Sequence, residues 1–250
     1  MTHALLGRAA AVVIAATAPA CTRATAPFSS TATSVCGGSA RASSPDEALA
    51  ERRACQPKRF KMIHQVAAGF QGKTYVMAGY LLGRSDGVFL VSGSGPSGPR
   101  LFEVTKNGSR IRSVTHVAQA RGKLDPERMA RVIDLVYFAE CPQGSGVATA
   151  DRYLYRCAVE SLDGDVDSME MELDRRTLAV IAKRFDRAGE RQASARFEGY
   201  RDSADLPVAS RIRFEHRNGF SLDIALIEYR APFEFGDDLL ELTADGETPP

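Results

Sequence analysis

The chain has 250 residues and a net charge of +1, from 32 basic and 31 acidic side chains. Duplex nucleic acid requires a concentrated basic face, so we expect no nucleic-acid partner. The sequence contains no tryptophan, so nothing in it indicates a tryptophan platform on which bases or sugars could stack.

The first twenty residues have the layout of a bacterial secretory signal. An apolar run from Ala9 to Ala18 follows Arg8 and leads into the small-residue triplet that ends at Ala20. The run is too short for a transmembrane helix, which needs about 20 apolar residues. We therefore predict a signal peptide over residues 1–20.

Cys21 follows the predicted cleavage site, the position at which bacterial lipoproteins are acylated. We predict that Cys21 is lipidated, with palmitate-type chains that anchor the protein to a membrane. Thr22 is not the Asp that retains lipoproteins in the inner membrane, so we expect the outer membrane, facing the periplasm. The alternative is ordinary cleavage, which gives a secreted or periplasmic soluble protein with an odd thiol at Cys21.

The other four cysteines are Cys36, Cys55, Cys141 and Cys157. An even number in an exported chain predicts two disulfides. Of the three possible pairings we favour Cys141–Cys157 and Cys36–Cys55, because each closes a short loop. The chain contains no C-x-x-C motif, which argues against a zinc or thioredoxin-like site.

Composition predicts a lipid anchor and flexible tether over 21–44, one folded domain over 45–240, and a disordered tail over 241–250. The tether is rich in Ser, Thr, Ala and Gly and has little to bury. Ser44 can cap a helix that begins at Pro45, and acidic residues favour its first turn. We predict a short helix over 45–54.

Strand patterns dominate from Phe60 onward. The clearest is 168–173, where Met and Leu alternate with polar residues. Turn pairs such as Asn107-Gly108 and Asn218-Gly219 separate the apolar runs and indicate hairpins. The predicted strands are 60–68, 74–82, 88–92, 100–105, 110–117, 150–159, 168–173, 177–185, 193–200, 209–216 and 220–229. The pattern predicts a mainly β fold, an antiparallel meander of about eleven strands with a few helices.

One amphipathic helix is predicted over 126–138, between the fifth and sixth strands. Asp125 can cap it and Pro126 fits its first position. It is either a core element packed on the sheet or a lid over a cavity. Its apolar face consists of Met129, Val132, Ile133, Val136 and Tyr137.

Two motifs resemble ligand loops but fail on context. The G-x-G-x-x-G pattern at 93–98 precedes a strand instead of a helix, and Pro96 and Pro99 remove amide donors, so we predict a hairpin loop. The D-x-D-x-D run from Asp163 has Ser168 where a calcium loop needs Gly, and is better explained as a polar turn.

No pattern predicts catalysis, a metal or a cofactor. His64, His116 and His216 are isolated on strand-like segments, with no paired ligand nearby in the sequence. The chain contains no G-x-S-x-G elbow. We therefore expect a protein that is not an enzyme, has no cofactor and is a monomer.

The cysteine after the signal, the small-residue tether, the leading helix and the long meander together resemble the LolA/LolB-like bacterial lipoprotein carriers. More narrowly, the chain resembles an uncharacterised lipoprotein family with a LolB-like fold, in the stretches 60–80, 87–107 and 206–229. The resemblance implies an antiparallel half-barrel, an unclosed β-barrel capped by helices. In the best-known members its cavity holds the acyl chains of lipoproteins. The acceptor in that family has a protruding apolar loop residue, whereas the comparable loop here, Ser92–Pro99, has none beyond proline.

By this resemblance the expected function is to bind a lipid, the acyl chains of a lipoprotein or another apolar ligand. A dry cavity of roughly 300 Å³ or more under the 126–138 helix would favour it. The alternative is a structural or protein-interaction lipoprotein with a solid core and no ligand. Candidate cavity-lining residues alternate along three strands. They are Met169, Met171, Leu173, Ile212, Phe214, Leu222, Ile224 and Leu226.

Overall fold

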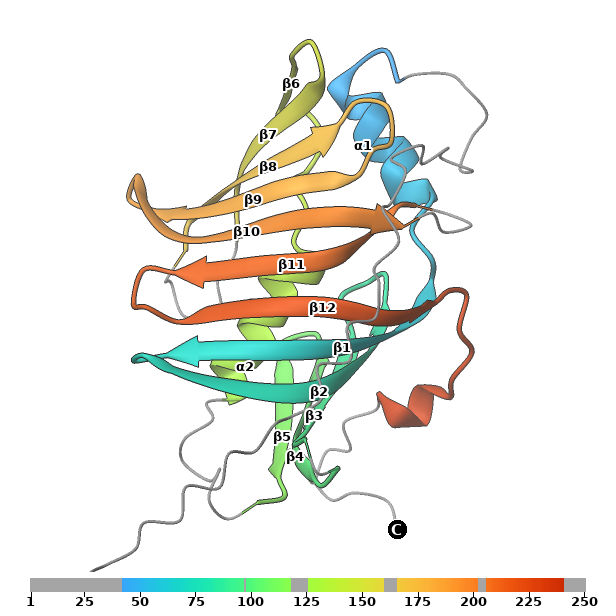
Figure 1. Cartoon of the computed structure of the whole chain (residues 1–250). Coiled ribbons are helices and arrows are strands. Elements are labelled where there is room, and N and C mark those ends of the chain that lie inside the picture. The colour runs from blue at the N-terminus through green and yellow to red at the C-terminus, as the bar shows by residue number, and fades with distance from the viewer. Residues whose placement is uncertain (1–41, 97, 118–125, 160–165, 202–205, 241–250) are drawn as a thin grey trace, which may run out of the picture.

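The structure, a computed structural model, describes residues 42–96, 98–117, 126–159, 166–201 and 206–240. In these residues twelve strands form one antiparallel sheet that does not close into a barrel (Figure 1). The mainly β, half-barrel prediction is therefore confirmed. The predicted signal peptide, Cys21, Cys36, the tail and all but the last three residues of the tether lie outside the described residues.

The first five strands lie in order from the middle of the sheet to one edge. After a crossover, the other seven lie in order from the opposite edge back to the middle. After α1 (Pro45–Ala54) come β1 (Arg59–Phe70), β2 (Lys73–Arg84), β3 (Phe89–Ser94), β4 (Arg100–Asn107) and β5 (Arg110–Thr115). Then follow α2 (Pro126–Ile133), η2 (Asp134–Phe138), β6 (Gly146–Ala148), β7 (Arg152–Ala158) and β8 (Ser168–Asp174). The last strands are β9 (Val180–Arg187), β10 (Glu190–Arg201), β11 (Val208–His216) and β12 (Ser221–Arg230), before the short η3 (Asp237–Leu239).

The pairing of β1 with β12 joins the two halves of the sheet. The strand order is β5-β4-β3-β2-β1-β12-β11-β10-β9-β8-β7-β6. Every other neighbouring pair is consecutive in the chain, as in a meander. The connection from β5 to β6 therefore runs from one edge of the sheet to the other, and this connection contains α2 and η2.

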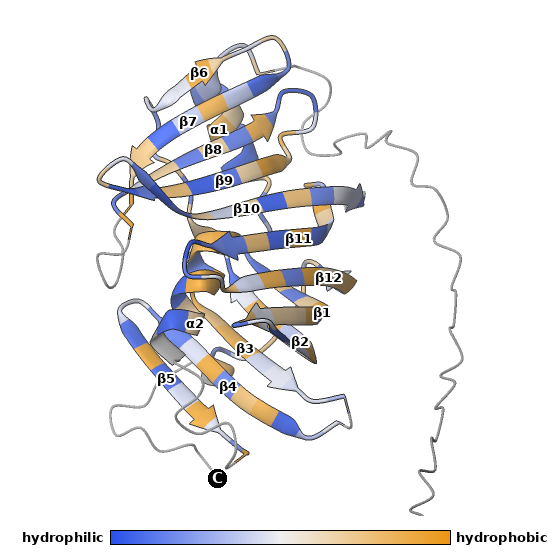
Figure 2. Cartoon of the chain, turned by 60° about the vertical axis from the view of Figure 1, so that its left-hand side comes forward, coloured by the Kyte–Doolittle hydropathy of each residue, from blue (hydrophilic) through white to orange (hydrophobic). Residues whose placement is uncertain are grey.

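Local sequence explains most of the strands. Hydrophilic and hydrophobic residues alternate along β8 to β12 (Figure 2), which gives the sheet one apolar and one polar face. The Gln71-Gly72 turn has φ of 50° and 74°, and the Ala188-Gly189 turn has 49° and 81°. Positive φ at both central residues is typical of the type I′ turn, which matches the twist of a hairpin.

Two strand predictions needed correction. β6 was not predicted, because its three residues at the sheet edge are too few to show alternation. β9 begins at Val180 and not at 177, because Asp174 ends the preceding strand in a turn. Its Oδ1 accepts hydrogen bonds from the backbone N–H groups of Arg176 and Thr177, both at 2.9 Å.

Helix α1 has the predicted bounds. Ser44 accepts a hydrogen bond from the backbone N–H of Glu47, and Ala48 and Leu49 are fully buried. The end of the predicted tether also belongs to this packing. Ala42 is buried, and its carbonyl accepts a hydrogen bond of 2.5 Å from the hydroxyl of Tyr153.

The predicted 126–138 helix is present but changes its geometry at Ile133. The last five residues form the π-helical turn η2, in which the N–H of Ala139 bonds to the carbonyl of Asp134 at 2.8 Å. The helix packs on the inner face of the sheet between two hydrophobic clusters. The larger cluster joins α1, η2 and the strands β7 to β12, and the smaller one joins α2 to β1 through β4.

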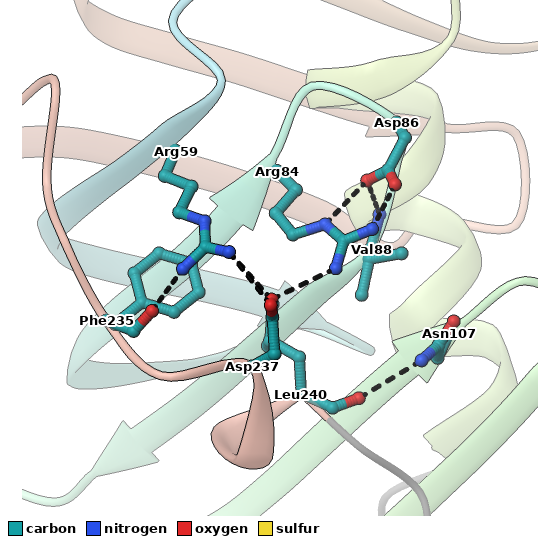
Figure 3. A network of polar contacts seen from close by, with 8 residues as sticks. All are labelled: Arg59, Arg84, Asp86, Val88, Asn107, Phe235, Asp237 and Leu240. Atoms are coloured by element: carbon teal, nitrogen blue, oxygen red, sulfur yellow. Dashed lines mark hydrogen bonds and ion pairs between the residues drawn. The ribbon is translucent and has the colours of Figure 1, made fainter.

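The segment after β12 covers part of the outer face. Phe233, Phe235 and Leu240 pack against Leu82 and Leu90, which point away from the inner face. A polar network fastens the segment, in which Asp237 Oδ1 lies 2.9 Å from Nη2 of Arg59 and 3.2 Å from Nη1 of Arg84 (Figure 3). No helix in the described part of the chain is long and apolar enough to cross a lipid bilayer.

Candidate ligand-binding cavity

A cavity of about 140 Å³ lies between η2 and the inner face of the sheet. Strands β1 and β9 to β12 form its floor, η2 forms its roof, and the end of α1 lies at one side. Most of the wall is apolar, and a smaller set of polar side chains faces it. The apolar lining includes Phe60, Met62, Val136, Phe138, Val180, Phe197, Leu206, Ile212, Ile224 and Leu226. The polar lining includes Arg52, Gln56, His64, Ser85, Tyr137, Lys183, Tyr200 and Tyr229.

The apolar floor is a cross-strand row. Ile224 on β12 pairs with Ile212 on β11, which pairs with Phe197 on β10. Residues directly opposite on neighbouring antiparallel strands point to the same face, so the three side chains lie side by side. Arg211 and Arg213, the chain neighbours of Ile212, are exposed on the other face.

The roof is built by the π-helical turn. Phe138 stacks on Phe89, with ring centroids 5.3 Å apart and planes inclined by 5°, and it also stacks on Phe60. Val136 and Tyr137 line the cavity beside it. π-helical turns occur within helices mostly as single turns and are frequent at functional sites.

Lys183 is buried in this apolar region and binds the end of the roof. Its Nζ donates hydrogen bonds to the carbonyl oxygens of Leu135 at 3.2 Å, Val136 at 2.9 Å and Ala139 at 2.7 Å. Burial lowers the pKa of Lys183 to about 7, against the opposing effect of the Glu140 carboxylate. A cation is favourable at the C-terminal end of a helix, where carbonyl groups lack partners.

His64 and Tyr137 form a second polar contact between floor and roof. Nε2 of His64 lies 3.0 Å from the hydroxyl oxygen of Tyr137. His64 is 5 % exposed, and burial lowers its pKa to about 4. Burial also raises the pKa of Tyr137. Both side chains are therefore uncharged at neutral pH.

The side of the cavity next to α1 is charged. Arg52 Nε lies 3.1 Å from Oε1 of Glu140, and Nη1 donates to the carbonyl oxygen of Leu178 at 2.9 Å. Gln56 also donates to Glu140, at 2.5 Å. These contacts tie the end of α1 to the segment that follows η2.

The structure brings together some of the residues predicted to line the cavity and separates others. Ile212, Ile224 and Leu226 are in the wall. Four others pack in the larger hydrophobic cluster, and Leu222 packs against it. The four are Met169, Met171, Leu173 and Phe214.

The predicted lid residues are also divided. Val136 and Tyr137 face the cavity, whereas Val132 belongs to the larger cluster. Met129 and Ile133 pack against the smaller cluster. At about 140 Å³, the cavity is also smaller than the roughly 300 Å³ that would favour a lipid carrier.

Sequence reasoning missed the polar lining. His64 was treated as an isolated side chain, although it lies in the wall. Lys183 was not singled out, yet a signal for it exists. It stands two residues before the buried Phe185, so its side chain lies on the same, apolar face of β9.

The disulfide Cys141–Cys157 is present, with a Cα–Cα distance of 5.5 Å, and confirms that pairing. It joins the segment after η2 to β7. Cys55 is also disulfide-bonded. Cys21 and Cys36 lie outside the described residues, so the pairing Cys36–Cys55 stays a prediction.

The other motifs carry no site in the described residues. Residues 93–98 run from the end of β3 into the loop before β4. In this loop the N–H of Gly95 donates to the carbonyl of Pro99 and the N–H of Gly98 to that of Gly95, and residue 97 is outside the description. Residues 163–165 of the D-x-D-x-D run are also outside it, and β8 (Ser168–Asp174) follows directly after the run. Within the described ranges, no three His, Cys, Asp or Glu side chains gather to hold a metal ion.

No family model matches the sequence, and no curated protein matches it. A LolA superfamily protein from Nitrosomonas europaea aligns over 81% of this chain and 98% of its own, with 12% identity and a TM-score of 0.56. A DUF1329 family protein from Desulfovibrio piger aligns over 82% of this chain and 99% of its own, also with 12% identity and a TM-score of 0.56. These likenesses concern the fold. The chain has a LolA-type fold, as the resemblance in its sequence predicted.

Proposed function

We propose that this protein is an exported lipoprotein that binds a lipid, or the acyl chains of a lipoprotein, in the cavity beneath η2. The observation that carries the proposal is the apolar floor of Phe197, Ile212 and Ile224 beneath a helical roof, inside a LolA-type fold. Small-ligand sites are concave and mostly apolar, with a few polar groups that fix orientation. We propose no covalent chemistry.

Binding of an acyl chain requires the roof to move. An engineered cavity of about 150 Å³ takes a benzene-sized molecule, so the 140 Å³ present here accommodates part of a chain. Space for the rest of the acyl chain becomes available when η2 lifts from the floor. Lys183 and the His64–Tyr137 pair are the polar contacts that such a movement would break.

The cellular setting is part of the proposal. We propose that Cys21 is acylated and that the protein is held at the outer membrane, facing the periplasm. The disulfide Cys141–Cys157 supports an oxidising compartment, since disulfides persist there and are rare in the cytosol. A soluble periplasmic or secreted form is the alternative.

Native mass spectrometry of the protein, produced in a bacterial periplasm, tests the binding function. We expect additional mass that extracts into organic solvent. Ala209 lines the cavity, so Ala209→Phe should fill it and abolish the additional mass. Ala158→Phe, at an exposed position of β7, is the matched control and should retain it.

A second candidate function follows from the size of the cavity. Most of the predicted lining is solid core, which is also what a structural or protein-interaction lipoprotein would have. A bare polypeptide mass, still bare after incubation with lipids or an acylated peptide, would reject the carrier function in favour of this one.

A further inference from the structure

Most polar groups in the cavity wall are engaged by the protein itself. The three N–H groups of Lys183 face three carbonyl oxygens. The hydroxyl of Tyr200 donates to the carbonyls of Val180 and Phe197. His64 differs, because its Nε2 contacts Tyr137 while its Nδ1 has no hydrogen-bond partner among the residues that the structure describes.

The hydroxyl of Tyr137 fixes which nitrogen of His64 carries the proton. Within the described residues, the hydrogen-bond partner of this hydroxyl is Nε2 of His64. If Nε2 carried the proton, the Tyr137 O–H and the Nδ1 lone pair would both lack partners, whereas donation from the hydroxyl to Nε2 leaves only the Nδ1–H unpaired; since each buried unpaired group costs about 1–3 kcal/mol, the hydroxyl donates to Nε2. A neutral imidazole that accepts at Nε2 carries its proton at Nδ1. The cavity wall therefore contains an N–H donor that lacks a protein acceptor.

The surroundings of His64 favour an uncharged acceptor. Its cross-strand neighbours are Leu226 on β12 and Gly79 on β2, which bring no acceptor side chain and no charge. The wall cations Lys183 and Arg52 are bound to carbonyl oxygens, and Arg52 also to Glu140. Because the N–H groups of Lys183 are all engaged by carbonyl oxygens, a carboxylate beside His64 would be buried without a hydrogen-bonded cation, which is costly.

We propose that the Nδ1–H group of His64 is the polar anchor of the cavity and selects apolar ligands that carry an uncharged oxygen acceptor, such as an ester or amide carbonyl. Hydrocarbons and carboxylates of equal length bind less tightly. This inference rests on the binding function proposed above. The carbonyl and the nearest carbons of the ligand occupy the cavity with the His64–Tyr137 contact in place, and a longer chain extends beyond the cavity.

NMR spectroscopy of the ¹⁵N-labelled full chain tests the assignment with three probes: methyl hexanoate, heptane and hexanoate. In the free protein at pH 7 we expect His64 in the Nδ1–H tautomer. Methyl hexanoate should shift the Nδ1 signals of His64 and bind at least tenfold more tightly than heptane or hexanoate. His216 is an internal control, because it lies at the end of β11 with Nδ1 3.2 Å from the N–H of Asn218, and its signals should not move.

A double variant gives a second readout. Combining His64→Phe with Tyr137→Phe removes both polar partners together and leaves no buried group unpaired, which limits the loss of stability. We expect the affinity for methyl hexanoate to fall about tenfold, a cost of about 1.4 kcal/mol, while that for heptane is unchanged.

The outcomes separate this inference from the binding function. Equal binding of methyl hexanoate and heptane, without a shift at His64, overturns the inference and leaves the binding function standing. An ester preference that persists in the double variant also overturns it. If none of the three probes binds, both the inference and the binding function fail.

Discussion

The ammonium group of Lys183 lies 2.7 Å from the carbonyl oxygen of Ala139, the residue that directly follows η2. This contact joins the middle of β9 to the C-terminal end of η2, which forms the roof of the cavity. It supplies a donor where a π-helical turn ends and its carbonyls lack partners. It also places a cation in an apolar core, which lowers the pKa of Lys183 to about 7.

The stability of the protein should therefore rise with pH above neutrality. The folded pKa of Lys183 is below its ordinary value of 10.5, so the unfolded chain binds more protons between about pH 7 and 10.5. The free energy of unfolding then increases with pH in this window, by up to about 1.4 kcal/mol per unit for one group. Urea melts at pH 6, 7, 8 and 9 measure it.

The variant Lys183→Met isolates this contribution, since other groups also titrate. The difference in unfolding free energy between wild type and Lys183→Met should increase from pH 7 to pH 9. Lys58 is exposed, and Lys58→Met should give a curve parallel to wild type. Parallel curves for all three proteins would mean that the Lys183 ammonium is not desolvated in the folded state.

The disulfide Cys141–Cys157 should contribute substantially to stability. It closes a loop with a sequence separation of 16 residues, for which the chain-entropy model gives about 3 kcal/mol. The double variant Cys141→Ala and Cys157→Ala should lower the free energy of unfolding by about 2–4 kcal/mol in urea melts. A change below about 0.5 kcal/mol would show that the packing of the segment after η2 against β7 does not depend on the bond.

The sequence was sufficient where the structure depends on local periodicity. The alternation at 168–173, the cap at Ser44 and the Asn-Gly turns each act within a few residues, and α1 and eleven of the strands follow from them. The pairing of His64 on β1 with Leu226 on β12 joins distant segments, and local patterns do not encode such pairing. The sequence therefore predicted a meander but not this pairing of its first and last strands.

The cavity also depends on contacts between distant segments, and this limited its prediction from the sequence. Alternation tells which face Met171 and Ile212 occupy, but not which part of that face is covered by η2. That depends on the crossover from β5 to β6, which places Tyr137 over His64. The π-helical end of this helix has no signature in an amphipathic pattern of period 3.6, which continues through Tyr137.

The segment after β12 should be held by apolar burial more than by its ion pairs. Asp237 contacts Arg59 and Arg84, but its side chain is 50% exposed, and exposed pairs contribute about 0–1 kcal/mol. Leu240 is 1 % exposed, and Leu→Ala at a buried site costs about 2–5 kcal/mol. In thermal melts Leu240→Ala should lower the melting temperature clearly, whereas Asp237→Asn should lower it slightly. If Asp237→Asn lowered the melting temperature more than Leu240→Ala, the polar network in Figure 3 would be what holds the segment.

Acylation at Cys21 should decide where the protein is found, without affecting how it folds. Two or more acyl chains anchor a protein stably, whereas a single chain binds a membrane reversibly. The wild type, expressed in a bacterium, should therefore sediment with membranes, resist carbonate extraction, and yield an N-terminal peptide that carries acyl mass on Cys21. Cys21→Ser should move the protein to the soluble periplasmic fraction with an unchanged melting temperature, because the described packing begins at Ala42. A wild-type protein that is soluble, processed after Ala20 and unmodified at Cys21 would establish the secreted or periplasmic alternative, and ligand transfer would then not involve a tethered protein.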